Sequence, residues 1–237
     1  MTPPPTPSSQ DMDPVYRLNG VDLAVPDGLA NASIIEKLAN GTYEEDEARS
    51  VDRCVRSGFR VLELGAGLGY VGTLAARKTE PGNVLSVEAN PDLIPVIRSN
   101  HARNGVEDIS LMHGAVVGYA EEAATASFHI ADGFTGSRLG ARGGRQVEVP
   151  LIGFHELIRA HRPHVVLMDV EGAEAAYFDR SWKCPLRFCV MEIHPKQYGA
   201  EVIKKIIDRM SAMDMTYDPV TSRGKVLGFR KVWSEGT

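Results

Sequence analysis

An apolar run that stops at three closely spaced glycines is the feature that most constrains this chain. The segment from Phe59 to Tyr70 reads FRVLELGAGLGY, so Gly65, Gly67 and Gly69 punctuate it directly after a strand-like run. Glycine lacks a Cβ, which lets the backbone approach a ligand closely and adopt positive φ, and a following helix directs free N–H groups to the same point. The pattern predicts a buried strand, a tight turn and a helix that together form a nucleotide-sized cradle.

The residues around these glycines distinguish between two nucleotide cofactors. The spacing Gly-x-Gly-x-Gly differs from the dinucleotide fingerprint Gly-x-Gly-x-x-Gly, and Glu63 stands two positions before the first glycine. The next predicted strand ends at Glu88, where a carboxylate can accept hydrogen bonds from both ribose hydroxyls. Alone, the glycines are compatible with a simple turn and the acids with exposed strand ends. Together they favour S-adenosylmethionine over NAD, so a dinucleotide-dependent oxidoreductase is the less favoured alternative.

Length and charge limit the other possibilities. At 237 residues the chain suits a single domain, which we divide into a disordered tail (1–14), an N-terminal flank (15–57) and a core (58–237). A net charge of −5 gives no basic footprint for nucleic acid, and no apolar stretch is long enough to span a membrane. The amino terminus lacks the basic start and apolar run of a secretory signal, so we expect a cytoplasmic protein.

The order of the predicted elements indicates an α/β fold. Alternating residues around Asn19-Gly20 predict a hairpin in the flank, followed by helical stretches. From Phe59 onward strands alternate with helices, which predicts a mostly parallel sheet covered on both faces. We expect strands at 59–64, 83–88, 109–113, 164–170 and 187–193, an antiparallel pair at 215–219 and 226–233, and helices at 69–79, 91–103, 153–161, 173–180 and 199–212.

One long segment interrupts this alternation. Residues 132–145 are rich in glycine and carry Arg138, Arg142 and Arg145, and a loop of this length in a compact domain is usually functional or mobile. The arginines are suited to binding an anionic group on a substrate. Solvated loop charges are the simpler interpretation, and we favour it.

Ionisable residues gather where two later strands end. Asp169 and Glu171 follow one strand, and Glu192 and His194 close the next. Residues two apart on a strand point to the same side, so all four side chains converge if the strands are neighbours. They would then lie beside the cofactor, because ligands of α/β sheets bind at the carboxyl ends of the strands.

These residue types suit methyl transfer from a sulfonium. The reaction needs in-line positioning and, for a hydroxyl acceptor, a base that takes the proton as the oxygen attacks. His194 has the best-matched usual pKa, while Asp169, Glu171 or Glu192 are alternative bases or orienting groups. Strand-end hydrogen bonding is an equally simple role for Asp169 and Glu192.

Two further interpretations concern the same block of residues. Glu174 is expected to be a charge that interacts favourably with the start of a helix. Carboxylates could also hold magnesium, but magnesium prefers oxygen ligands and the set contains a histidine, so we expect no metal ion.

Three blocks in order carry a resemblance to a known family. Residues 41–44 (GTYE), 62–69 (LELGAGLG) and 169–174 (DVEGAE) resemble the FkbM family of S-adenosylmethionine-dependent methyltransferases. The resemblance implies a class I, Rossmann-like methyltransferase fold, with Tyr43 and Glu44 closing over the methionine end of the cofactor and Ala115 bordering the adenine. Many relatives carry aspartate where this chain has Glu63, which is a conservative difference.

The resemblance also implies an acceptor class. Many relatives methylate a hydroxyl of a sugar or polyketide, as in natural product biosynthesis, and some methylate a peptide side-chain amide. We therefore expect O-methylation of a small-molecule acceptor, with N-methylation of a peptide amide and an inactive cofactor-binding scaffold as alternatives. The candidate cofactor-binding residues are Tyr43, Glu44, Glu63, Gly65, Ala66, Gly67, Tyr70, Glu88, Ala89, Ala115 and Asp169.

Overall fold

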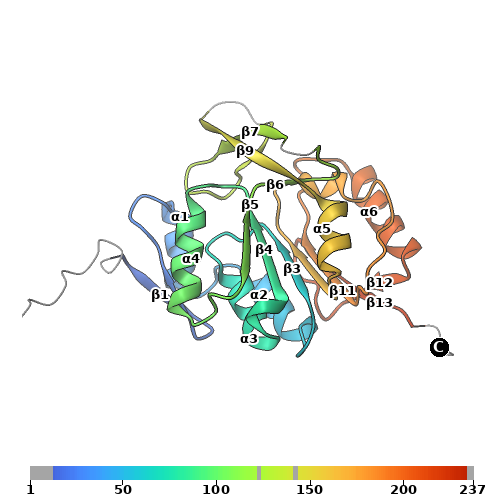
Figure 1. Cartoon of the computed structure of the whole chain (residues 1–237), viewed down its shortest axis with the longest axis horizontal. Helices are drawn as coiled ribbons and strands as arrows, with labels where there is room; N and C mark the ends of the chain where they lie inside the picture. Colours follow the sequence, from blue (N-terminus) through green and yellow to red (C-terminus); the bar gives the residue numbers. More distant parts are fainter. Residues whose placement is uncertain (1–12, 122–123, 141–143, 234–237) are drawn as a thin grey trace, which may run out of the picture.

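The computed structural model describes residues 13–121, 124–140 and 144–233 (Figure 1). The predicted disordered tail, residues 1–14, lies outside this part of the chain except for its last two residues. Among the described residues, no helix is both long and apolar enough to cross a membrane.

The flank begins with the predicted hairpin, which is confirmed. Strands β1 (Val15–Leu18) and β2 (Val21–Ala24) pair antiparallel around Asn19-Gly20, and both turn residues have positive φ. Two helices follow, α1 (Ala32–Ala39) and α2 (Glu45–Cys54).

Seven strands form the central sheet, in the order β12-β13-β11-β10-β3-β4-β5. The pairings β4–β5, β3–β4, β3–β10 and β10–β11 are parallel, and β13 is antiparallel to both of its neighbours. The predicted mostly parallel sheet with a final antiparallel pair is therefore confirmed. The strands are β3 (Val61–Leu64), β4 (Val84–Glu88), β5 (Ser110–His113), β10 (Val165–Met168), β11 (Phe188–Glu192), β12 (Met215–Tyr217) and β13 (Val226–Lys231).

Helices cover both faces of this sheet because its strands are apolar on both sides. Val61 and Val165 pack into a core shared with the flank and with α3 (Tyr70–Lys78) and α4 (Leu93–Arg103). Their neighbours Leu62 and Val166 point the other way, into a core with α5 (Phe154–His161) and α6 (Ala200–Ala212). This alternation fixes which side chains reach each face.

A second, four-stranded sheet was not predicted. It has the order β6-β9-β7-β8, and β6 follows directly after β5, so this small sheet lies beside the carboxyl end of the central one; β7 and β9 are at the top of Figure 1. Its apolar residues, among them Phe128 and Val149, form a separate small core. The strands are β6 (Ala115–Val117), β7 (Thr125–Ile130), β8 (Arg138–Leu139) and β9 (Arg145–Gly153).

This sheet corrects the prediction of one continuous loop over 132–145. The segment contains β8, and β9 begins at Arg145. Alternating apolar residues at Ala126, Phe128 and Ile130 were the sequence signal for β7, but the glycine-rich composition next to them obscured it.

The helix expected over 173–180 is also wrong, because only a single 3₁₀ turn, η3 (Ala173–Ala176), forms there. The next residues, Tyr177 and Phe178, are both fully buried, and their rings pack on Phe154 and Trp182. The backbone oxygen of Tyr177 accepts a hydrogen bond from the Trp182 indole N–H at 2.9 Å, so a tertiary contact takes the place of the helical hydrogen bond there.

Candidate active site

The glycine turn after β3 has the geometry that its sequence predicts. Gly65, Gly67 and Gly69 all have positive φ, at 83°, 54° and 79°. A Cβ at Gly65 would lie 1.9 Å from the backbone oxygen of Asp169, and one at Gly67 would lie 2.8 Å from the hydroxyl of Tyr43. Any larger residue at these two positions would therefore collide with its surroundings.

Glu88, at the end of β4, is tied to this turn. Its Oε2 accepts a hydrogen bond from the Gly67 N–H at 3.0 Å, and its Oε1 accepts one from the Asn90 N–H at 2.8 Å. The side chain is buried, and burial raises the pKa of the carboxyl. The carboxylate thus lies at the base of the cradle, where the ribose of a nucleoside cofactor was predicted.

Glu63 lies in β3, two residues before the glycine turn. It is buried, accepts a hydrogen bond from the Ser86 hydroxyl on the neighbouring strand, and faces Gly72 of α3, where a Cβ would lie 2.5 Å from its Oε2. Burial raises the pKa of Glu63 to about 7. Glu63 thus contacts both β4 and α3, the two elements that flank the glycine turn.

A cavity opens above the glycine turn, between the central sheet and the small sheet. Its apolar end is formed by Leu93, Ala115 and Phe128, and its polar end by Tyr43 and Asp169. Three of the predicted cofactor-binding residues, Glu63, Ala66 and Tyr70, are not among its lining residues. The predicted residues that do line it are Tyr43, Glu44, Gly65, Gly67, Glu88, Ala89, Ala115 and Asp169.

Tyr43 and Glu44 approach this cavity from the flank. The Tyr43 hydroxyl is buried and has no hydrogen-bond partner among the described residues. Glu44 is the residue immediately before α2, and its backbone has a left-handed conformation with φ 47°. Burial, reinforced by the charge of Glu47, raises the pKa of Glu44 well above its usual range. Both groups are therefore available to interact with a ligand that carries positive charge.

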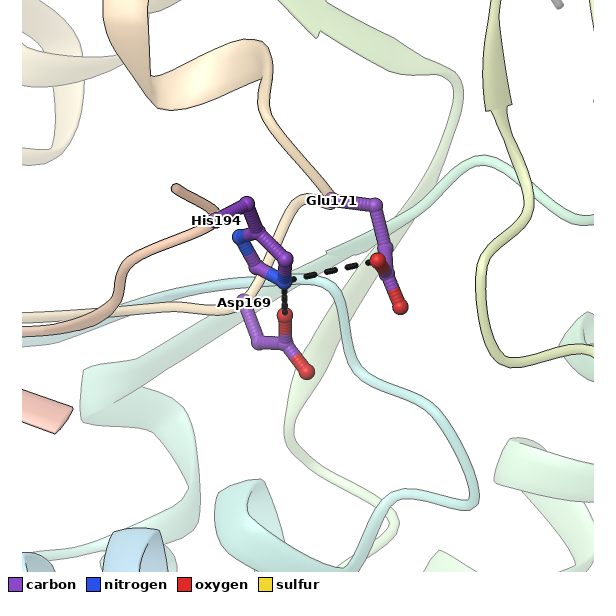
Figure 2. Close-up of side chains that lie close together, drawn as sticks. All are labelled: Asp169, Glu171 and His194. Atoms are coloured by element: carbon purple, nitrogen blue, oxygen red, sulfur yellow. Dashed lines mark ion pairs between the residues drawn. The ribbon is translucent and has the colours of Figure 1, made fainter. Parts of the chain in front are cut away.

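Asp169, Glu171 and His194 come together at the polar end of the cavity (Figure 2). The Nε2 atom of His194 lies 3.4 Å from Asp169 Oδ1 and 3.4 Å from Glu171 Oε2. Strands β10 and β11 are neighbours, as the predicted convergence requires. However, β10 ends at Met168, so Glu171 reaches the cluster through a turn in which its own φ is +52°, and not through strand alternation.

Sequence reasoning missed the partner that holds the histidine. Glu174 is fully buried, and its Oε1 accepts a hydrogen bond from His194 Nδ1 at 3.1 Å and another from the Tyr198 hydroxyl. Its Oε2 accepts the N–H of Gly172 at 2.9 Å. The predicted interaction at the start of a helical turn is therefore only part of its role. The i, i+3 spacing from Glu171 gave no indication of the contact with His194, which comes from the next strand.

Two titrating groups of the cluster are shifted in the same direction. Burial, followed by the charges of Glu192 and Glu171, raises the pKa of Asp169. Burial alone would lower the pKa of His194, but the hydrogen bond to Glu174 and the charges of Asp169 and Glu171 outweigh it and raise that pKa. Both groups hold protons at a higher pH than they do in water.

A second cavity adjoins the first and is strongly acidic. Glu44, Asp169 and Glu171 line both cavities, and Glu192 lines only the second, where its carboxylate pairs with Lys225 at 3.5 Å. His194 lines neither cavity, since it lies behind Asp169 and Glu171. The remaining charged residues of the second cavity are Lys37, Glu45, Asp46, Glu47 and Arg223.

The segment that precedes β8 covers the junction of the two cavities. The N–H of Gly136 donates to Glu171 Oε1 at 2.8 Å, and Arg138 lines the first cavity. Arg145 is instead paired with Asp92, and Arg142 lies outside the described residues. Of the two loop arginines within the described residues, Arg138 is thus the one placed at the candidate site.

The fold and the glycine cradle define a class I, Rossmann-like methyltransferase. The chain belongs to the FkbM methyltransferase family, because residues 64–220, more than half of its length, match the methyltransferase FkbM domain.

More distant similarities agree with this class. Two curated relatives are protein-L-isoaspartate O-methyltransferases. That of Methanothrix thermoacetophila is 38% identical over 71 residues (29% of this chain and 34% of the relative), and that of Methanoculleus marisnigri is 43% identical over 70 residues (29% and 31%). The match thus spans about a third of the length of these relatives. A transferase of Pyrococcus horikoshii has a similar fold, with a TM-score of 0.50 and 14% identity over 93% of this chain and 72% of that one.

The first cavity fits S-adenosylmethionine on structural grounds. Its floor is a backbone turn that tolerates no Cβ at Gly67, and a buried carboxylate, Glu88, lies beside that turn. The unpartnered Tyr43 hydroxyl and the half-buried acids Glu44 and Asp169 lie at the polar end, where they favour a positively charged group. The apolar end offers small and aromatic side chains to a flat ring.

Proposed function

We propose that this protein transfers the methyl group of S-adenosylmethionine to a hydroxyl of a sugar or other natural-product acceptor. One observation carries the proposal: Asp169 and Glu171 line both the cofactor cavity and the adjoining cavity, with His194 directly behind them. A group that must take a proton from the acceptor belongs at this junction.

In this proposal Glu88 and the glycine turn hold the nucleoside, while Tyr43 and Glu44 close over the methionine end. S-adenosylmethionine, when bound, supplies an electrophilic methyl group on a sulfonium. Glu63 contributes to cofactor binding indirectly, by supporting the glycine turn, because it packs against β4 and α3 on either side of the turn. Ala66 and Tyr70 likewise act through the turn and the start of α3, since neither lines the cavity.

The acceptor lies in the second cavity, and its proton leaves to the Asp169–Glu171–His194 cluster. The raised pKa values of Asp169 and His194 suit proton transfer near neutral pH better than those of exposed carboxylates would. Glu174 fixes the His194 ring through Nδ1, which leaves Nε2 directed at Asp169. Proton removal by such groups is effective for a hydroxyl, whereas an amide nitrogen is a poor nucleophile because its lone pair is delocalised into the carbonyl.

The charge of the second cavity restricts the acceptor further. Among its lining residues the carboxylates outnumber the basic groups, and Arg223 and Lys225 are already paired with Asp46 and Glu192. A neutral or cationic acceptor is favoured over an anionic one, since like charges in a cavity repel strongly. Hydroxylated aminosugars are a chemical class that fits this requirement.

Mass spectrometry tests the proposal. The protein is incubated with S-adenosylmethionine and a panel of neutral, cationic and anionic sugars and polyols together with asparagine-containing peptides, and the added methyl group is located by fragmentation. We expect methylation on oxygen, confined to neutral or cationic acceptors. Methylation on an amide nitrogen would replace the proposal with the peptide alternative. If S-adenosylmethionine binds but no acceptor of any class is methylated, the inactive scaffold becomes the better description.

A further inference from the structure

The spacing within the cluster of Asp169, Glu171 and His194 is unusual for hydrogen bonding. Both carboxylate oxygens lie 3.4 Å from His194 Nε2, and neither contact is a hydrogen bond. A charge-assisted N–H···O bond would be about 2.7–2.9 Å long. Two ligand atoms that each lie about 2.1 Å from one ion, at a tetrahedral angle, are about 3.4 Å apart. The separation therefore matches the spacing expected of two ligand atoms around a shared cation.

Each of the three residues is held so that one atom remains directed at this common point. Glu174 accepts a hydrogen bond from His194 Nδ1, which turns Nε2 toward the carboxylates. Gly136 N–H donates to Glu171 Oε1, which leaves Oε2 facing Nε2. Outer partners of this kind orient the ligands in most protein metal sites, and a carboxylate on the far side of a ligating histidine is the usual example.

A buried polar atom without a hydrogen bond provides independent support. Asp169 Oδ1 is buried and has no hydrogen-bond partner in the described part of the chain. The side chain of His194 is 10% exposed, and its Nε2 is aimed into the same gap. Leaving a buried oxygen unsatisfied is costly, and a bound ion would satisfy it. The ligand atoms of the three residues all lie within 4.8 Å of one another.

We propose that Asp169, Glu171 and His194 form a binding site for one divalent transition metal ion, such as Mn²⁺, Fe²⁺ or Zn²⁺. The sequence favoured no metal because histidine argues against magnesium, but one imidazole with two carboxylates suits these softer ions. The two carboxylates line the acceptor cavity, so free coordination positions face it. In catalysis the ion would lower the pKa of an acceptor hydroxyl, and the Asp169 carboxylate oxygen that does not bind the ion would take the proton. This catalytic role rests on the proposed function, whereas binding of the ion does not.

Titration of the metal-free full-length protein with MnCl₂ or ZnCl₂, by calorimetry and by elemental analysis after gel filtration, tests the site without any acceptor. We expect one ion per chain. Glu174→Gln should weaken binding about 10–100-fold, the range typical for an outer partner, and Asp169→Asn and His194→Gln should weaken it more. Glu47→Gln, an acid-to-amide change in the same cavity outside the cluster, should stay within about twofold of the wild type.

Melting temperatures separate loss of the site from loss of the fold. The ion should raise the melting temperature of the wild type and of Glu47→Gln, but not that of His194→Gln, since an ion that binds only the folded state stabilises it. Absence of stoichiometric binding, or equal affinity in wild type and His194→Gln, would overturn the metal site. Methyl transfer that persists in excess chelator would refute its catalytic role and leave the proposed function intact. Failure of chelated protein to bind S-adenosylhomocysteine would count against the proposed function alone.

Discussion

The two cavities that meet at Asp169 are assembled from the chain in very different ways. The cofactor cavity takes its polar floor from the glycine turn after β3 and from Glu88 at the end of the next strand, β4. The acceptor cavity draws on the flank, on the segment before β8, on the ends of β10 and β11, and on residues 223–226. The floor of the first cavity is a local motif on two adjacent strands, although its walls come from other segments, whereas the second cavity exists only once distant segments have packed.

This difference predicts how each cavity responds to substitution. A change in the cofactor cavity should alter affinity for S-adenosylmethionine and leave the chemistry alone. A change in the Asp169–Glu171–His194 cluster should lower turnover and leave affinity for S-adenosylmethionine nearly unchanged. If substitutions in the two cavities changed affinity and turnover in the same way, the assignment of separate roles to the two cavities would be wrong.

Asp169→Asn should have the largest effect. We expect turnover to fall about 10²–10⁴-fold, because the amide cannot take a proton and is a poor ligand for a cation. S-adenosylhomocysteine affinity, measured by calorimetry, should change only a few-fold, since Asp169 borders the cavity but does not form its floor. A comparable loss in both quantities would show that the residue mainly holds the cofactor.

Glu88→Gln should have the next largest effect, and on binding. Removing the charge from a hydrogen-bonded carboxylate is expected to weaken S-adenosylhomocysteine binding by roughly 1.5–3 kcal/mol, or about 10–150-fold. Turnover at saturating cofactor should be nearly unchanged. An unaltered dissociation constant in a variant with wild-type melting behaviour would contradict the ribose role.

Gly67→Ala should weaken cofactor binding about tenfold, because the new Cβ meets the Tyr43 hydroxyl and overfills the cradle. Gly105→Ala is the matched control, since Gly105 has a similar φ of +67° but open space around it. Both variants should melt at a lower temperature than the wild type, because alanine is less stable than glycine at positive φ. Only Gly67→Ala should bind the cofactor more weakly. Equal affinity in the two variants would mean that the turn is not part of the site.

The glycine turn and the acid beside it were accessible from the sequence because their signals are local. Glycine spacing, the acid at the end of β4 and the strand–turn–helix order all lie within 30 residues, and backbone geometry follows from them directly. The parallel sheet and its antiparallel end were equally accessible, since continuous apolar runs separated by helical stretches admit few arrangements.

The acceptor side was less predictable for a physical reason. Glu174 is recognisable as a partner of His194 only once β10 and β11 lie side by side. Phe128 and Val149 form the core of the small sheet through pairing of β7 with β9 across a glycine-rich segment that gives no strand signal. Contacts of this kind depend on tertiary packing, which overrides local propensity.

Glu63→Gln should have the smallest effect on the cofactor, within about threefold, because Glu63 lies beneath the turn. Its main consequence is for stability. The folded-state pKa of about 7 exceeds the usual 4.5, so the stability contributed by the neutral carboxyl is fully present below pH 4.5 and is lost as pH rises through 7. The variant should therefore gain on the wild type between pH 5 and pH 8, by up to about 3 kcal/mol. Denaturant unfolding at several pH values measures this gain, and a pH-independent difference would show that Glu63 is not buried and ionisable as described.

Hydrogen–deuterium exchange with and without S-adenosylhomocysteine tests the central claim most directly, because it needs no acceptor and no substitution. Since a bound ligand suppresses local opening around its site, we expect slower exchange at residues 65–70, 87–90 and 114–116. Residues 31–37 and 223–226, which line only the acceptor cavity, should be unaffected. Protection confined to the acceptor cavity, or absent from the glycine turn, would contradict the assignment of the two cavities.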